Sequence, residues 1–248
     1  MRGAVTMRAR GFTLVELLVS LLIGLFLLGG LLTLVQNNKR TFTTQNSLAQ
    51  LQDGERLAMS VMTDVIQTAG YFPTPQSITA GQALPAATVN GTVWAKAQVV
   101  SGVDGAGATG DTVSVRYETN SGDGILSCNG TSNTSGAVYK YYNTFSVNAL
   151  NQLVCTRGDL PAGANAFPLV SGVTSLQVLY GVNSAGTANT VDTYMTATQV
   201  TANGRWANVI SVQLALTFTN PLYTAANAGQ TATITFQRTV GLMSVIGI

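Results

Sequence analysis

The chain has 248 residues, of which only 9% are charged, and it contains no histidine. Without histidine or clustered carboxylates, Ser-His-Asp catalysis, Cys-His catalysis and most zinc sites are excluded, so we expect no enzyme, no metal site and no cofactor. Three of the 12 basic residues precede residue 11, and the remaining 9 face 10 acidic residues, so no basic surface for nucleic acid is expected. No feature indicates a small-molecule substrate.

The first element along the chain is an apolar run over residues 12–35, in which Glu16 is the only charge. As a helix, these 24 residues would be about 36 Å long, which is enough to cross a bilayer. Arg2, Arg8 and Arg10 precede the run, so the N-terminus is expected to stay cytoplasmic while the remainder crosses. The run therefore predicts one transmembrane helix segment.

Two ordinary explanations of this run are a cleaved secretory signal peptide and a plain signal anchor. The run exceeds the apolar core of about 7–15 residues that a signal peptide has, and no A-x-A site follows it. A plain anchor gives no reason for Glu16, because a charge at that depth costs roughly 2.5–3.5 kcal/mol. Glu16 therefore either has a partner or is a protonated residue without a role.

The order of residues at the start of the run is specific. The chain reads Gly-Phe-x-x-x-Glu from Gly11 through Phe12 to Glu16. This pattern resembles the class III signal of type IV pilins and type II secretion pseudopilins. The resemblance implies that residues 1–11 are a prepilin leader, removed after Gly11 by prepilin peptidase, and that Phe12 is then N-methylated. It also implies that Glu16 serves subunit assembly by pairing with the Phe12 amine of a neighbouring subunit.

Beyond the membrane segment, an apolar stripe with helical spacing continues. It predicts that residues 36–70 are an amphipathic extension of the same helix, laid on a globular domain through Leu48, Leu51, Ala58, Met62, Val65 and Ala69. Glycines interrupt the helix and indicate either weak points or close packing, at Gly24, Gly29, Gly30 and Gly54. Pro73 and Pro75 then forbid its continuation.

Residues 71–248 are predicted to form one β-rich extracytoplasmic domain. The fold class is therefore α+β, with a long N-terminal transmembrane helix packed against a C-terminal antiparallel β-sheet domain. Most strand candidates alternate in polarity and are rich in Val, Tyr, Thr and Phe. They cover residues 97–100, 112–118, 137–147, 152–156, 174–182, 207–219 and 231–243.

Cys128 and Cys155 are the only cysteines, and an even pair in an exported chain predicts one disulfide. The alternative is a pair of reduced, buried thiols. Redox catalysis is not expected, because the sequence contains no C-x-x-C motif.

The remaining chemical groups favour structural roles. Asp192 is the one carboxylate of a long polar loop, and a hard-cation site needs several charged oxygens, so a plain hairpin loop is favoured. Trp94 and Trp206 are expected to pack rather than to bind a ligand. Asp111 and Glu118 lie seven residues apart on one predicted strand and face opposite sides, so they are a poor acid–base pair.

Four segments resemble the PilW family of minor pilins, which is related to GspJ-type minor pseudopilins. They are Ala69-Gly70-Tyr71, residues 172–182, residues 206–216 and Arg238-Thr239-Val240. The likeness is good over the first 70 residues, moderate over the C-terminal third and poor in the middle of the chain.

The resemblance implies a structural assembly protein that primes or extends a type IV pilus near its tip. Its expected location is the inner membrane, crossed once with the C-terminal domain in the periplasm, followed by incorporation into the extracellular pilus. Expected partners are other minor pilins, the major pilin, prepilin peptidase and the inner-membrane assembly platform, with a tip adhesin as a further candidate. Two alternatives stay open: a minor pseudopilin of a type II secretion system, and a fibre-displayed adhesin or DNA-uptake subunit.

Overall fold

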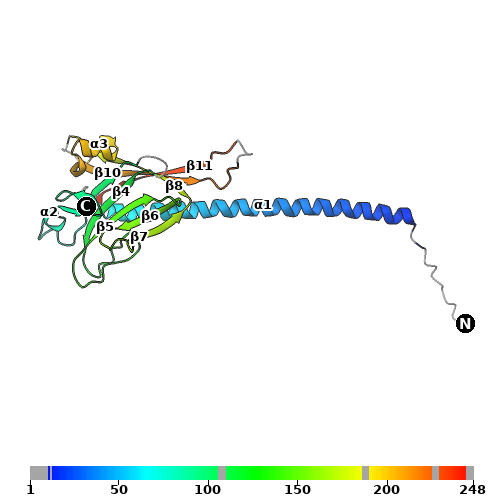
Figure 1. Ribbon diagram of the computed structural model, residues 1–248, viewed down its shortest axis with the longest axis horizontal. Coiled ribbons are helices and arrows are strands. Elements are labelled where there is room, and N and C mark those ends of the chain that lie inside the picture. Colours follow the sequence, from blue (N-terminus) through cyan, green and yellow to red (C-terminus); the bar gives the residue numbers. More distant parts are fainter. Residues whose placement is uncertain (1–10, 12, 106–109, 186–189, 225–228, 244–248) are drawn as a thin grey trace. The chain divides into compact units, whose positions relative to one another are not determined.

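The computed structural model describes residues 11, 13–105, 110–185, 190–224 and 229–243. One long helix, α1 (Leu14–Gln67), is followed by a domain built mostly of antiparallel strands (Figure 1). The predicted fold class is thereby confirmed. The chain divides into two compact units, residues 1–48 and 49–248, and α1 contributes residues to both.

Within the second unit, α1 buries the apolar stripe that the sequence predicts. The side chains on the buried face are at most 3% exposed, and they are Ala58, Met59, Met62, Val65 and Ile66. An added Cβ at Gly54 would lie 3.1 Å from Cγ1 of Val170, so this glycine permits close packing of the helix on the domain. In the first unit, by contrast, no described atom beyond the nearby helix backbone and the adjacent residues lies within 4 Å of the same position on Gly24, Gly29 or Gly30.

The end of α1 is fixed to the domain behind it. Gly70 follows the helix with a φ of 80°, a left-handed conformation that glycine adopts without strain. Its N–H donates to the carbonyl of Arg116 at 2.9 Å, and the carbonyl of Tyr71 accepts the N–H of Glu118 at 2.8 Å. The chain therefore leaves the helix directly onto a strand of the domain.

Two antiparallel sheets and a small hairpin make up the domain. The five-stranded sheet has the order β3-β4-β5-β6-β7, with β3 (Val100–Val103), β4 (Thr112–Thr119), β5 (Tyr139–Val147), β6 (Gln152–Arg157) and β7 (Ala166–Ser171). The four-stranded sheet has the order β11-β10-β8-β9, with β8 (Val173–Val182), β9 (Thr193–Met195), β10 (Val209–Thr219) and β11 (Thr233–Gly241). The hairpin pairs β1 (Ala87–Val89) with β2 (Thr92–Trp94), and the short helical elements are α2 (Ala80–Ala83), α3 (Ala197–Ala202) and η1 (Trp206–Asn208).

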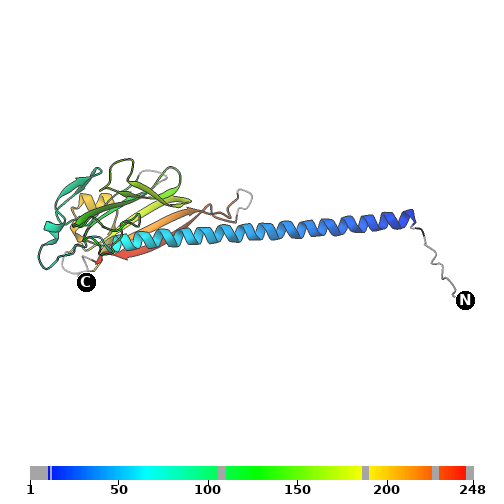
Figure 2. The same ribbon diagram turned by 90° about the horizontal axis from the view of Figure 1, so that it is seen from below.

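One hydrophobic core joins α1 to both sheets. From Val212 to Phe218 along β10 every second side chain enters this core, namely Val212, Leu214, Leu216 and Phe218, whereas the residues between them are half-buried. This period of two is what a sheet with one covered face requires. Figure 2 shows β11 running beside the C-terminal part of α1. There, Nη1 of Arg238 donates to Oγ1 of Thr63 at 3.3 Å.

Several short elements differ from the prediction. Asn90 and Gly91 have φ values of 47° and 78°, so they form the tight turn of the unpredicted hairpin β1–β2. The third strand begins at Val100 rather than at residue 97, because Ala97 has a φ of 61° and cannot extend a strand. β7 and α3 are further elements that the sequence does not indicate. β7 contains Pro168, which is unusual within a strand, and α3 is too short to show a helical period.

Candidate functional site

The predicted processing motif stands at the start of α1. Gly11 and Glu16 are described, whereas Phe12 and residues 1–10 lie outside the described residues. Glu16 is exposed, and its carboxylate has no ion pair within the part of the chain that the structure describes. The carboxylate is therefore open to a partner from elsewhere.

Thr13 gives this end of the helix a cap that sequence reasoning missed. Its carbonyl and its hydroxyl accept the N–H of Glu16 at 3.1 and 3.4 Å. Threonine followed three residues later by glutamate is the sequence signature of a capping box, and an acidic side chain in the first turn also suits the helix dipole. Glu16 thus has a local role that is compatible with any role between subunits.

The N-terminal part of α1 presents an apolar surface. From Leu14 to Val35, every large apolar side chain is more than half exposed. By length and composition, α1 is the one helix among the described residues that could span a membrane. Side chains of this kind need a bilayer or other helices around them, because leaving them in water forfeits roughly 1.5–3 kcal/mol each.

The predicted disulfide is confirmed. Cys128 and Cys155 are bonded, with 5.9 Å between their Cα atoms and 27 residues of separation. Cys155 lies on β6. Cys128 lies on a long loop, and the N–H of Cys128 donates to Oδ1 of Asn143 at 3.0 Å. The bond therefore attaches this loop to the five-stranded sheet.

A buried ion pair next to the disulfide holds the same loop. Arg157 pairs with Asp159, and its Nη1 donates to Oγ1 of Thr131 at 2.7 Å. The guanidinium also lies 4.7 Å from the ring centroid of Tyr141, and the hydroxyl of Tyr139 donates to Asp159 at 3.0 Å. Burial raises the pKa of both tyrosine hydroxyls above their ordinary range, so they stay protonated at neutral pH. These contacts hold the loop on the five-stranded sheet.

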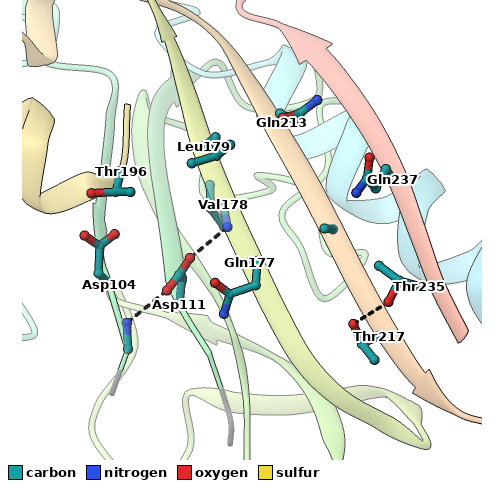
Figure 3. A pocket seen from close by; sticks show the side chains of 12 residues that line it. Asp104, Asp111, Gln177, Val178, Leu179, Thr196, Gln213, Thr217, Thr235 and Gln237 are labelled. Carbon is teal, nitrogen blue, oxygen red and sulfur yellow. Dashed lines mark hydrogen bonds between the residues drawn. The ribbon is translucent and has the colours of Figure 1, made fainter. Parts of the chain in front are cut away.

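The outer face of the four-stranded sheet forms an open concavity of about 600 Å³ (Figure 3). Its walls are mostly neutral polar side chains, with Gln177 on β8, Gln213 and Thr217 on β10, and Thr235 and Gln237 on β11. A surface of this kind is the ordinary solvated face of an antiparallel sheet.

The two carboxylates at the margin of the concavity are occupied by backbone groups. Asp104 accepts the N–H groups of Ala197 and Thr198 at 2.8 and 2.9 Å, and so caps α3. Burial alone would raise the pKa of Asp104, but its hydrogen bonds together lower that pKa below the ordinary value. Asp111 accepts the N–H groups of Val178 and Gly105 at 2.8 and 3.0 Å. Neither carboxylate is therefore placed as an acid, a base or a metal ligand.

The residues that the sequence left as weak chemical candidates also have structural roles. Asp192 accepts the hydroxyl and N–H of Ser184, which lower its pKa, and residues 186–189 of that loop lie outside the described part. Glu118 pairs with Lys140 at 2.8 Å, on the five-stranded sheet. Among the described residues no group of three or more His, Cys, Asp or Glu side chains could hold a metal ion.

The two tryptophans pack, as the sequence predicts. Trp94 is 2% exposed and lies beneath the guanidinium of Arg116, which is 5.0 Å from its ring centroid. Trp206 packs edge-on against Tyr180 and donates its Nε1–H to Oγ1 of Thr201 at 3.0 Å. Neither ring is a free platform for a ligand.

Two family models match the chain. The model of type IV pilus-assembly protein W matches residues 140–244, and the model of the prokaryotic N-terminal methylation motif matches residues 6–32. The two matches support a type IV pilin-like subunit, whose residues 140–244 are similar to PilW. No curated protein and no solved structure gave a match.

The two matches cover different parts of the structure. The methylation-motif match contains Gly11, Phe12 and Glu16 and most of the apolar surface of α1. The PilW match runs from β5 through β11, so it contains Cys155 but not Cys128. A pilin-type helix and a PilW-type domain therefore stand in one chain, which makes it a pilin-like subunit that is anchored by its helix.

Proposed function

We propose that this chain is a minor pilin that helps to prime or extend a type IV pilus as a structural subunit near the tip. The observation that carries the proposal is the methylation motif at Gly11, Phe12 and Glu16, joined directly to a helix whose apolar side chains are exposed. Burial of that helix among other helices is the work that such a subunit does. Prepilin peptidase would cleave after Gly11, and Phe12 would then be methylated.

The proposed location follows from the order of charges along the chain. The arginines before residue 11 stay in the cytoplasm, α1 crosses the inner membrane once, and the disulfide-bonded domain lies in the periplasm before the subunit enters the extracellular pilus. The proposed partners are other minor pilins, the major pilin, prepilin peptidase and the assembly platform, with a tip adhesin as a further candidate.

Glu16 would neutralise the Phe12 amine of a subunit that is already in place. An unpaired carboxylate at that depth costs roughly 2.5–3.5 kcal/mol, so pairing favours one register between neighbouring helices. For the outermost subunit of the pilus, no further subunit lies above it with an N-terminal amine to neutralise. A chain that carries Glu16 is therefore proposed to lie below the tip, beneath another minor subunit.

Catalysis has no part in this proposal. The chain has no histidine, and the carboxylates Asp104 and Asp111 are engaged by backbone N–H groups. We expect no cofactor, no small-molecule substrate and no binding of nucleic acid.

Deletion of the gene tests the proposal. We expect surface pili to fall sharply while the protein itself stays scarce in sheared fibres, and the wild-type gene in trans should restore piliation. Normal pili with a loss of protein secretion would instead assign the chain to a type II secretion system. Its recovery as the dominant protein of the fibre would contradict the minor-pilin role.

A further inference from the structure

The four-stranded sheet ends in a long strand that is paired on one side only. β11 pairs with β10 in nine consecutive antiparallel pairs, without any register shift, and no described strand pairs with its other edge. Thr233, Thr235, Gln237, Arg238 and Thr239 are exposed along it. In Figure 3, β11 is the outermost strand of the sheet, and α1 passes behind it.

The hydrogen bonds at both ends of the strand identify which backbone groups are free. Asn220 donates its N–H to the carbonyl of Ala232, and Leu242 donates its N–H to the carbonyl of Ile210, at 2.9 and 2.8 Å. In an antiparallel pair, the backbone N–H and C=O groups of successive residues point alternately toward the partner strand and away from it. Ala232 and Leu242 are both bonded to β10 or its continuation, so the even-numbered residues of β11 direct their backbone groups to β10. The N–H and C=O groups of the odd-numbered residues therefore point to the open edge, and these belong to Thr233, Thr235, Gln237, Thr239 and Gly241.

The other sheet edges in the described chain are short, interrupted or covered. β9 has three residues and β3 has four, while β7 contains Pro168 and faces a register shift in β6. The far edge of β8 is covered by Asp111, whose N–H donates to the carbonyl of Leu176 at 2.7 Å and whose carboxylate accepts the N–H of Val178. Shortness, interruption and covering are usual ways in which proteins protect a sheet edge, and the nine-residue β11 is neither short, nor interrupted by a register shift, nor paired with a further described strand.

We propose that β11 is a docking edge to which a neighbouring pilin-type subunit adds an extended strand. Free N–H and C=O groups in a row require a strand as their partner, and strand addition supplies it through main-chain hydrogen bonds. The proposal rests on the proposed function for the presence of that neighbour. The edge of β11 would be the surface through which the β domain binds the neighbour, in addition to the contacts that α1 makes.

The side chains of β11 define the chemistry of the added strand. On the outer face it would lie beside Thr235 and Gln237, which favour small neutral polar residues. On the α1 side it would lie beside Phe236, which is half-buried, and this favours apolar residues. Arg238 is the only charge of β11 and has no ion pair among the described residues, so a carboxylate opposite it is favoured.

A second copy of this chain fits the edge less well. Two β11 strands related by a two-fold axis would run antiparallel and would turn the two copies in opposite directions. Subunits rooted in one membrane by the same helix face the same way. The occupant is therefore a different segment, carried by a neighbour of the same orientation.

Two substitutions at one position separate the edge from its side chains. Gln237→Pro removes an N–H that points outward and leaves the pairing with β10 intact, because proline is tolerated at such positions of edge strands. Gln237→Ser keeps the N–H and is the matched control. Both are made in the full chain, which is purified in detergent together with the pilin-type subunits that accompany it from inner membranes.

The complex with Gln237→Pro is expected to be recovered at least about fivefold less than that with Gln237→Ser, since one main-chain hydrogen bond is lost. Equal recovery of the two variants would overturn the proposal.

Hydrogen exchange gives a second readout that does not depend on any variant. In the isolated chain, the amides of Thr235, Gln237 and Thr239 should exchange fast, and those of Phe236 and Arg238 slowly. In the complex, the three fast amides should slow by at least about tenfold. Unchanged fast exchange in the complex, or slow exchange already in the isolated chain, would contradict a docking edge.

Two further outcomes separate the sources of protection. The isolated chain is also measured at rising concentration. If hydrogen exchange of the odd-numbered amides then slows and the mass of the particle doubles, two copies of this chain pair with each other, and the assignment to a neighbouring subunit is overturned. If gene deletion leaves piliation normal while the complex still protects these amides, the proposed function fails and the docking edge stands.

Discussion

Arg116 provides the sharpest prediction about the stability of the domain. Its side chain is fully buried on β4, and it donates four hydrogen bonds to backbone carbonyls. Nε donates to the carbonyl of Gln98 and Nη1 to that of Pro85, both at 2.7 Å. Nη2 donates to the carbonyls of Ala95 and Leu84 at 2.7 and 3.1 Å. The guanidinium therefore joins both ends of the segment that carries the hairpin β1–β2 to the five-stranded sheet.

Burial lowers the pKa of Arg116, but arginine starts so far above neutrality that the group stays charged at pH 7. Without the guanidinium, the carbonyls of Leu84 and Ala95 still accept the backbone N–H groups of Ala97 and Gln98. The carbonyls of Gln98 and Pro85 lose their Arg116 donor, and at about 1–3 kcal/mol for each buried acceptor the loss is about 3–5 kcal/mol. An apolar replacement does not avoid this cost, since the four carbonyls belong to the main chain and remain. Arg116→Met is therefore expected to lower the melting temperature by roughly 6–20 °C in a domain of this size.

The assay is thermal unfolding of the full chain in detergent, followed by circular dichroism. Arg205→Met is the matched control, because Arg205 is partly exposed and donates to one carbonyl, that of Ser184, at 2.7 Å. The control should lose about 1 kcal/mol or less. Arg116→Lys should fall between the two, since three donors on a flexible stem cannot satisfy four carbonyls. Equal melting temperatures for Arg116→Met and Arg205→Met would refute the reasoning.

Reduction of the Cys128–Cys155 disulfide should slow the denatured chain on a gel and cost about 3–4 kcal/mol of unfolding free energy, whereas labelling of both thiols in unreduced protein would contradict the bond. Glu16→Ala should leave cleavage and insertion intact but reduce co-purification with other pilins, and Glu16→Asp should be intermediate because it keeps the charge and loses reach. Normal complexes and piliation in the Glu16→Ala strain would remove the pairing argument. Asp104→Asn should be less stable than the parent at pH 7. Because the folded state lowers the pKa of Asp104, this difference should be complete above the ordinary carboxyl pKa and shrink as pH falls below about 4; a difference independent of pH would contradict it.

The parts of the fold that could be predicted are those with a long periodic pattern. The apolar run and the stripe ending near Ala69 define α1, and the alternation over residues 207–219 gives β10. The disulfide followed from export and from the pairing of two cysteines. Each of these signals is local in sequence or is a property of composition, so one chain is enough to detect it.

The missed features depend on partners that are distant in sequence. Arg116 reads as an exposed strand residue until the carbonyls of Leu84 and Pro85, about thirty residues earlier, close around it. Asp104 reads as a loop carboxylate until α3, more than ninety residues later, presents its N–H groups. The open edge of β11 follows only from the order of strands in the sheet, which tertiary packing decides.

Processing of the N-terminus decides whether this chain is a pilin-type subunit. Intact-mass measurement of the protein extracted from membranes tests this directly. The predicted result is a chain that begins at Phe12, lacks residues 1–11 and carries one added methyl group. In a strain with a mutated prepilin peptidase gene, the methyl group should be absent. A mature protein that begins downstream of Val35 would contradict the account, because an ordinary signal peptidase would then have removed the helix on which pilus assembly depends.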